Sequence, residues 1–305
     1  MDTTQQLIYL AGYIEGDGCF RAGITTQKSG QIVYERSITI TSVKEEPIIL
    51  FKELVGGFTY TEQKEGNRRK TYTWTIKNDA SLIVARKVLP FLDMKKKLCE
   101  LYISYCENIL ETKKRIVINT INDRNFLLKQ IREEIHESGK VSITQIEFIK
   151  TLSKTIAPSF QDFIYLAGFI DAEGCFRISK RFRKSTGIWI YNTCLEIGNT
   201  RIECIKWLYE RFGGSITYIS PRNKAKKPSA TWSCHAQILM PILKNVVEFL
   251  INKKEVCLEL IKFQKTILKN GGDRHSASHK ETYKAICQER ELIVEKVHKL
   301  NRTGL

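Results

Sequence analysis

The sequence lacks several features that would assign it to common protein classes. Its nine cysteines include no CxxC pair, which excludes a zinc ribbon and a thioredoxin-type redox site. Their number is odd and their spacing irregular, which favours reduced, mostly buried thiols over a disulfide framework. No apolar run reaches about 18 residues, so we expect no membrane span. Periodic sequence begins by Leu7, so we expect no targeting peptide. The protein is then expected to act where it is translated, in an organelle (chloroplast or mitochondrion) or in a prokaryotic cytoplasm.

Acidic residues are few compared with basic ones. The 305-residue chain carries 33 Asp and Glu against 49 Lys and Arg, which gives a net charge of +16. A surplus of this size favours a polyanionic partner, because each phosphate neutralised releases a condensed counterion. The alternative is a basic protein that its charge keeps soluble. The hydrophobic content of 42% indicates a globular chain, long enough for two domains.

The chain contains an internal repeat. Residues 7–21 read LIYLAGYIEGDGCFR, and residues 163–177 read FIYLAGFIDAEGCFR. The correspondence extends over a hundred residues at offsets of 156 to 158, through Gly56-Gly57 and Gly213-Gly214, Trp74 and Trp232, and Lys95 and Lys253. A change of only two residues in the offset is typical of a duplicated domain with small loop insertions. We predict a first repeat at 1–140, a linker at 141–161 and a second repeat at 162–305.

Each repeat shows the same order of expected elements. An apolar helix (7–15 or 163–171) is followed by two strands, a helix (46–55 or 201–212) that ends at paired glycines, and two further strands. Those strands flank turns at Gly66-Asn67 and 223–227. A helix from Ala80 and longer helices after the two repeated lysines complete each unit, and helix 124–137 matches 290–300. The predicted class is α+β, with two pseudo-symmetric αββαββα repeats and mixed or antiparallel sheets.

The repeated helices carry small residues and acids at defined positions. Gly12 and Gly16 lie on one helix face, as do Gly168 and Ala172, so two helix backbones could approach closely. Ordinary core packing is the alternative, but two copies favour a helix pair related by a pseudo-two-fold axis. The motifs end in Asp17 and Glu173, where the helix dipole leaves about half a negative charge. A bound cation would relieve that cost, and oxygen ligands favour a hard ion such as Mg²⁺. The alternative is a pair of solvated or hydrogen-bonded carboxylates.

These motifs resemble a known family. LAGYIEGDG at 10–18 and LAGFIDAEG at 166–174 are similar to the two motifs of a single-chain LAGLIDADG homing endonuclease, and the resemblance covers nearly the whole chain. It implies a magnesium-dependent, site-specific double-stranded DNA endonuclease, of the kind that spreads an intron or intein. Two or three divalent ions would be shared between the motif acids, activating water and stabilising the leaving oxygen.

The resemblance also assigns roles to particular residues. Asp17 and Glu173 would bind metal, together with the carbonyl groups of Gly16 and Ala172. Glu15 and Asp171 are interpreted as structural, with capping contacts. Further catalytic candidates are two lysines that would offset charge in the transition state and two polar residues where relatives often place a water-ordering Gln. These are Lys95 and Lys253, and Ser42 and Asn199, of which the last two depart from the family pattern.

Alternation along the strands predicts a polar, basic face opposite the helices. On a curved, antiparallel-rich sheet that forms a saddle, such a face suits the major groove, whereas a solvated sheet face is the alternative. We expect a pseudo-symmetric monomer on a DNA target of roughly 20 base pairs. The alternative function is an RNA maturase that binds intron RNA, or a regulator that only binds DNA; intact acids in both motifs favour the nuclease. The expected DNA-contacting residues are Arg21, Thr25, Gln27, Thr39, Arg69, Thr71, Thr73, Arg177, Ser179, Arg181, Arg183, Lys227, Ser229, Thr231 and Ser233.

Overall fold

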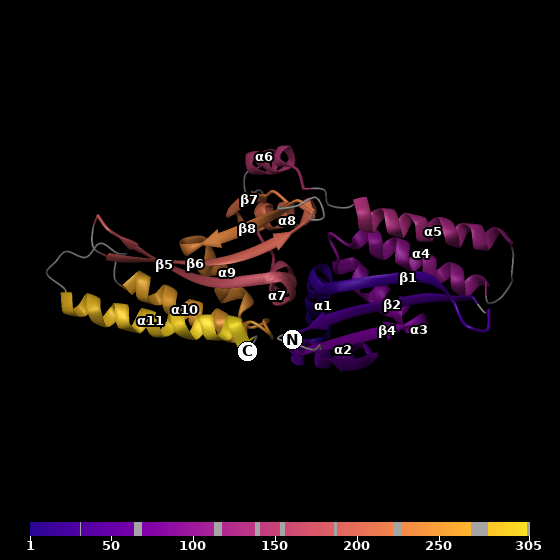
Figure 1. Cartoon of the computed structure of the whole chain (residues 1–305), viewed down its shortest axis with the longest axis horizontal. Coiled ribbons are helices and arrows are strands. Elements are labelled where there is room, and N and C mark those ends of the chain that lie inside the picture. Colours follow the sequence, from indigo (N-terminus) through magenta and orange to yellow (C-terminus); the bar gives the residue numbers. More distant parts are fainter. Residues whose placement is uncertain are drawn as a thin grey trace. The chain divides into compact units, whose positions relative to one another are not determined.

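The computed structural model divides the chain into two units, of which one takes in a segment from the other half of the sequence (Figure 1). It describes residues 1–30, 32–63, 69–112, 118–137, 141–152, 156–185, 188–221, 227–269 and 280–303. The first unit is Met1–Lys140 with Ile164–Ala172, and the second is Val141–Phe163 with Glu173–Leu305. Most of the second motif helix therefore packs as part of the first unit. The repeat boundaries 1–140, 141–161 and 162–305 remain a prediction about the duplication.

The first unit has the predicted αββαββα order. Its four strands form an antiparallel sheet in the order β1-β2-β4-β3. The predicted turn at Gly66-Asn67 lies outside the described residues. The elements are α1 (Thr3–Asp17), β1 (Gly18–Thr26), β2 (Ile32–Ser42), α2 (Glu46–Val55), β3 (Phe58–Glu62), β4 (Thr71–Lys77), α3 (Asn78–Val88), the short 3₁₀ helix η1 (Leu89–Phe91), α4 (Lys96–Thr112) and α5 (Ile118–Glu137).

The second unit repeats this arrangement, with an antiparallel sheet in the order β5-β6-β8-β7. The α+β class is confirmed, and all strand pairs are antiparallel rather than mixed. One helix, α6, lies within residues 141–161, which the sequence analysis predicted to be a linker. The elements are α6 (Ile143–Thr151), α7 (Phe160–Glu173), β5 (Gly174–Arg183), β6 (Ile188–Asn199), α8 (Ile202–Phe212), β7 (Ser215–Ile219), β8 (Ser229–His235), α9 (Ala236–Val246), α10 (Lys254–Lys269) and α11 (Lys280–Thr303).

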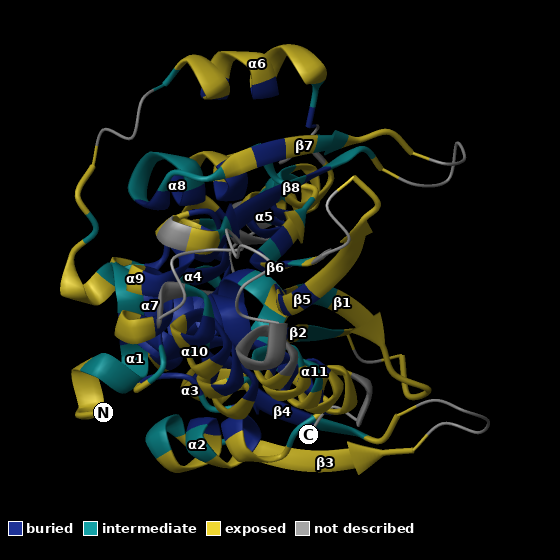
Figure 2. Cartoon of the chain, turned by 90° about the vertical axis from the view of Figure 1, so that its left-hand side faces the viewer, coloured by how far each residue is buried: buried dark blue, intermediate teal, exposed yellow. Residues whose placement is uncertain are grey.

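Strand alternation directs one face of each sheet into a helix-covered core. In the first unit, Phe20 lies 5.3 Å from the Tyr102 ring of α4, and Trp74 lies 6.1 Å from Phe51 of α2, measured between ring centroids. Trp74 and Phe51 are fully buried. Figure 2 shows the outer strand β3 exposed along its length, whereas its neighbour β4 is largely buried. The opposite face of the sheet is therefore left for polar contacts.

The glycine pairs and tryptophans noted in the sequence form one repeated structural unit. Trp74 Nε1 donates to the carbonyl of Gly56 at 2.7 Å, and Trp232 Nε1 donates to that of Gly213 at 2.6 Å. Gly56 and Gly213 have φ of 78° and 67°, a backbone conformation that favours glycine. Each turn ends a helix and fixes the tryptophan that the following strands carry. The duplication thus holds at the level of individual hydrogen bonds.

The last helices of the two units also correspond. The Arg124 guanidinium lies 3.9 Å from the centre of the Tyr34 ring, and that of Arg290 lies 5.4 Å from Tyr191. Both arginines are buried, so α5 and α11 are anchored to equivalent hairpins in the same way. This agrees with the predicted match between 124–137 and 290–300. Among the helices described, none is both long and apolar enough to span a membrane.

Candidate functional site

The end of the first motif helix is held by a buried carboxylate. Glu15, which is 3% exposed, accepts hydrogen bonds from the backbone N–H of Asp93 at 2.8 Å and of Lys95 at 2.9 Å. These contacts cap the segment that leads into α4, which confirms the structural interpretation of Glu15. Burial raises the pKa of Glu15, while the charge of Lys95 and the hydrogen bonds from the backbone of Asp93 and Lys95 act in the opposite direction.

Lys95 is bound to the carbonyl end of the same helix. Its Nζ donates to the carbonyl oxygens of Ile14 and Gly18, both at 2.7 Å, and of Gly16 at 3.3 Å. The side chain is 9% exposed. An ammonium at this position complements the negative end of the helix dipole, so part of the cost expected for an acid here is offset by the protein itself. Lys95 thus contacts the carbonyl of Gly16, which the family resemblance implied as a metal ligand.

The two motif helices approach each other closely, within the first unit. A Cβ added at Gly12 would lie 2.0 Å from the Tyr165 carbonyl oxygen, and one at Gly168 would lie 2.1 Å from that of Tyr9. The Tyr9 hydroxyl donates to Asp171 Oδ2 at 2.8 Å. The close packing predicted from small residues is confirmed at Gly12 and Gly168. The contacts on the two helices are reciprocal, as a pseudo-two-fold relation requires.

The acidic residues proposed for metal are exposed at the last positions of their helices. Asp17 ends α1 and Glu173 ends α7, and both side chains are exposed. In the part of the chain that the structure describes, no group of three or more His, Cys, Asp or Glu side chains could hold a metal ion. A cation at either helix end would therefore need carbonyl, water or phosphate oxygens in addition to the carboxylate. Such an all-oxygen set suits a hard divalent ion.

The second lysine is equivalent to the first in backbone position. The carbonyl of Lys95 accepts the N–H of Cys99 at 2.9 Å, and that of Lys253 accepts the N–H of Cys257 at 3.0 Å. Each lysine thus immediately precedes its helix, α4 or α10, and Lys253 is half-buried. The repeat therefore extends to the first hydrogen bond of these helices. The catalytic role of both lysines remains a prediction.

Ser42 and Asn199 support the backbone in equivalent turns. The Ser42 hydroxyl accepts the N–H of Lys44 at 3.1 Å, and Asn199 Oδ1 accepts the N–H of Arg201 at 2.8 Å. Both contacts form the turn between the second strand and the next helix. Ser42 is 5% exposed. In this structure both side chains stabilise the backbone conformation of their turns. Their proposed water-ordering role stays a prediction.

The first sheet presents its open face as a hollow of about 690 Å³. Arg21 lines this hollow and is exposed, Thr25 is exposed further along β1, Gln27 is exposed just beyond its end, and Arg69 is exposed before β4 begins. Thr39 and Thr71 are half-buried. The hollow also contains residues that the sequence interpretation missed, although strand alternation on β2, β3 and β4 could have identified them: Glu35, Ser37, Phe58, Tyr60, Thr75 and Lys77.

One residue assigned to this face is less accessible than predicted. Thr73 is 3% exposed. Its hydroxyl lies 3.1 Å from that of Thr41, and Tyr60 is its partner on the outer strand. The neighbouring strands cover it, so its hydroxyl satisfies a cross-strand contact. Thr73 therefore lies on the predicted face, two residues from Thr75 of the hollow, but it offers little accessible surface, and its contact with DNA stays a prediction.

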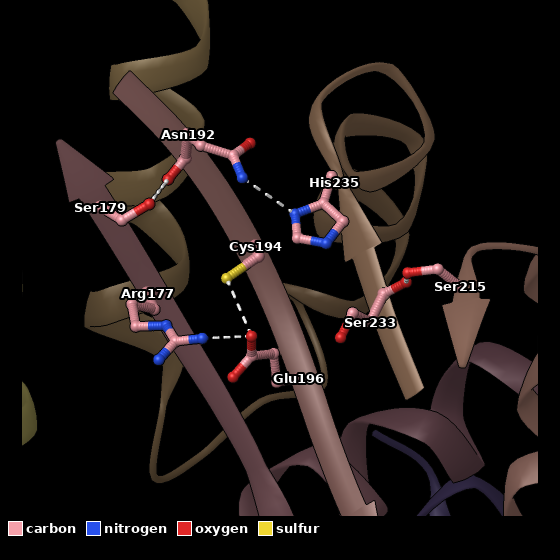
Figure 3. A network of polar contacts seen from close by, with 8 residues as sticks. All are labelled: Arg177, Ser179, Asn192, Cys194, Glu196, Ser215, Ser233 and His235. Atoms are coloured by element: carbon pink, nitrogen blue, oxygen red, sulfur yellow. Dashed lines mark hydrogen bonds and ion pairs between the residues drawn. The ribbon is translucent and has the colours of Figure 1, made fainter. Parts of the chain in front are cut away.

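The second sheet carries a longer basic row. Arg177, Ser179, Arg181 and Arg183 are all exposed on β5, and Lys227 is exposed before β8. Ser229 and Thr231 are half-buried, but Ser233 is 8% exposed. Ser233 lies between Glu196 of β6 and Ser215 of β7, which cover it, so it is on the predicted face but less accessible than expected, and its contact with DNA stays a prediction. Figure 3 shows residues of this face that the sequence interpretation had missed, Asn192, Cys194, Glu196 and His235.

Comparisons with known proteins agree with this geometry. A family model described as LAGLIDADG endonuclease matches residues 10–110 and 166–267. No curated protein matches the chain. Among solved structures, the I-SmaMI LAGLIDADG homing endonuclease bound to cleaved DNA is 16% identical, with a TM-score of 0.64 and coverage of 98% of this chain and 97% of that one.

Two further solved structures share the fold. The I-LtrWI LAGLIDADG homing endonuclease bound to target DNA is 16% identical, with a TM-score of 0.64 and coverage of 97% and 98%. The meganuclease I-AabMI bound to uncleaved DNA is also 16% identical, with a TM-score of 0.62 and coverage of 86% and 91%. The similarity thus extends over both repeats.

Proposed function

The chain belongs to the LAGLIDADG endonuclease family, and we propose that it hydrolyses both strands of one long, asymmetric double-stranded DNA site in a magnesium-dependent reaction. The observation that carries this proposal is the repeated motif helix. Each copy ends in an exposed carboxylate and continues directly into a strand whose open face carries an arginine, Arg21 in β1 and Arg177 in β5. A chain that only bound DNA would need neither acid.

The residues at the motif ends fit a divalent cation. We assign Asp17 and Glu173 to it, with the carbonyl groups of Gly16 and Ala172, because these donors are all hard oxygens. Two or three Mg²⁺ ions are part of the proposal. When bound, such ions supply an activated water and stabilise the leaving oxygen. One of the neighbours, I-SmaMI, is known bound to an uncleaved DNA target in the presence of calcium ions.

The protein's own residues perform the remaining tasks in this proposal. Three carbonyl contacts hold the ammonium group of Lys95 at the end of the first motif helix. Its positive charge would offset the negative charge that grows on the phosphate in the transition state. Lys253 takes the equivalent position in the second repeat. The three contacts of Lys95 hold its charge at a fixed place before DNA binds, and Lys253 has the equivalent backbone position just before α10.

The target is proposed to be asymmetric and about 20 base pairs long. One motif ends in Asp and the other in Glu, and the two open faces differ in sequence at most positions. The first face carries the aromatic residues Phe58 and Tyr60 on its outer strand, whereas the second carries Ser215 and Thr217 there. Unequal faces are expected to read unequal half-sites. The three matched structures named above are bound to DNA, and none of the three is described as an RNA maturase.

The direct test is cleavage of plasmids that carry candidate target sites. We expect a supercoiled plasmid with the correct site to become linear in magnesium. In calcium we expect it to be bound but left uncut, because calcium occupies oxygen sites without supporting this hydrolysis. A plasmid without the site is the control. Linearisation without any divalent ion, or improved splicing of a precursor RNA with no DNA cleavage, would contradict the proposal.

A further inference from the structure

An acidic side chain lies within the basic face of the second sheet. Glu196 on β6 forms an ion pair with Arg177 of β5, through Oε1 and Nη2 (Figure 3). The thiol of Cys194 lies 3.8 Å from the same Glu196 oxygen. The Arg177 side chain is 51% exposed and that of Glu196 is 24% exposed. Both groups therefore remain accessible from the open face.

Stability does not explain this pair. An ion pair between accessible side chains contributes little to folding, because solvent screens it and two long side chains must be ordered. A carboxylate on a DNA-binding face also repels phosphate, which lowers affinity for any sequence. Glu196 is therefore expected to do something that an uncharged side chain would not.

The first repeat offers a comparison at the equivalent positions. Arg21 corresponds to Arg177 in the repeated motif. Thr39 corresponds to Glu196, because Thr39 pairs in register with Cys19 and Glu196 pairs in register with Cys175. The Thr39 hydroxyl lies 3.2 Å from that of Thr75. The arginine is thus common to both repeats, whereas the residue in register with the cysteine is a threonine in the first and a carboxylate in the second.

We propose that Arg177 and Glu196 together read one guanine–cytosine base pair in the major groove of the half-site bound by the second repeat. This inference rests on the proposed function. The major-groove edge of that base pair presents guanine N7 and O6 as acceptors beside the cytosine N4 donor. Arg177 offers donors, and Glu196 offers an acceptor next to them. The ion pair holds the two groups side by side, as that edge requires.

The position of the pair locates the base pair. Arg177 follows Glu173 by four residues on an extended strand, which corresponds to roughly 13 Å. Successive base pairs are about 3.4 Å apart along the duplex. The base pair read by Arg177 and Glu196 should therefore lie about four base pairs from the cleaved phosphate of its half-site.

The experiment is binding selection from a randomised DNA library in calcium, followed by cleavage of the enriched sequences in magnesium. Glu196→Gln should reduce the preference for guanine–cytosine about tenfold at one base pair, or at two adjacent ones, and leave the other positions unchanged. Arg177→Gln should change the same position. Melting temperatures of the variants confirm that each protein is folded.

A matched control removes the same charge from the other side of the sheet. Glu291 on α11 forms an ion pair with Lys180, which neighbours Ser179 on β5 but points to the helix-covered face. Glu291→Gln changes the net charge as Glu196→Gln does, in the same unit. Its base profile should equal that of the wild type.

The outcomes separate this inference from the proposed function. A uniform gain in affinity for all sequences with Glu196→Gln would overturn the inference, because Glu196 would then act on phosphates alone. An unchanged profile in both variants would overturn it too, even if the wild type cuts DNA. A wild type that selects a sequence but never cuts it would contradict the nuclease, and the profiles would still decide the base-reading role. A wild type that selects no sequence would overturn both.

Discussion

At the scale of single residues, the end of the first motif helix combines a buried acid with a nearly buried lysine. Glu15 binds two backbone N–H groups, and Lys95 binds three carbonyl groups. The repeated sequence identified both positions, because each has a counterpart in the second repeat, Asp171 and Lys253. It could not show that Lys95 contacts the carbonyl of Gly16, since the geometry of a long side chain depends on how η1 and the start of α4 are placed against α1 and β1.

Glu15→Gln tests the capping role. Glutamine offers one acceptor oxygen in place of two, so one of the N–H groups of Asp93 and Lys95 loses its partner, at a cost of about 1–3 kcal/mol in the free energy of unfolding. Urea denaturation of the two proteins measures the difference. A variant as stable as the wild type would mean that this cap contributes nothing.

The difference in stability between the wild type and Glu15→Gln should depend on pH. Burial raises the pKa of Glu15 in the folded state above its ordinary value of 4.5. The contribution of the Glu15 carboxyl to the free energy of unfolding is thus fully present below pH 4.5 and is lost as the pH rises through the folded-state pKa. The stability advantage of the wild type over Glu15→Gln should therefore be larger at about pH 4 than at neutral pH. An advantage that grows with pH would show that the carboxyl is instead stabilised in its ionised form.

At the scale of elements, the sequence located helices well where strong start and stop signals flank them. The helix predicted at 46–55 has those bounds as α2, with Pro47 in its first turn and Gly56 at its end. The helix α6 was missed, although Ser142 and Gln145 form a capping box there. Its nine residues are too few for the apolar period to stand out, and contacts with α8 and β7 bury Ile146 and Ile149.

Gly12→Ala tests the packing of the motif helices. The added methyl would lie 2.0 Å from a backbone oxygen, which cannot move aside as a side chain can. We expect a loss of about 3 kcal/mol in the free energy of unfolding, the upper part of the range for overpacking. Gly23→Ala is the matched control, because its methyl would approach nothing nearer than Glu35 Oε2 at 3.9 Å. Equal melting temperatures for the two variants would contradict the close approach of α1 and α7.

At the scale of the whole molecule, duplication made the fold predictable. Two copies of each motif, glycine pair and tryptophan confirm one another, so a weak pattern in one half gains weight from the other. Strand alternation correctly predicted that Arg177 and Arg181 face outward. It failed for the accessibility of Thr73 and Ser233, because alternation gives the face of a side chain but not how far the neighbouring strands cover it.

The most direct measurement of the central claim compares DNA cleavage and DNA binding in Asp17→Asn and Glu173→Gln. If the two motif acids hold the catalytic cations, each single variant should cut the target at least about 100-fold more slowly in magnesium, as expected when one electrostatic group is lost from a transition state. Affinity for the uncut site in calcium should stay within about threefold, because these exposed carboxylates lie apart from the residues assigned to base contact. Full-rate cleavage by either variant, or loss of binding by both, would contradict the account.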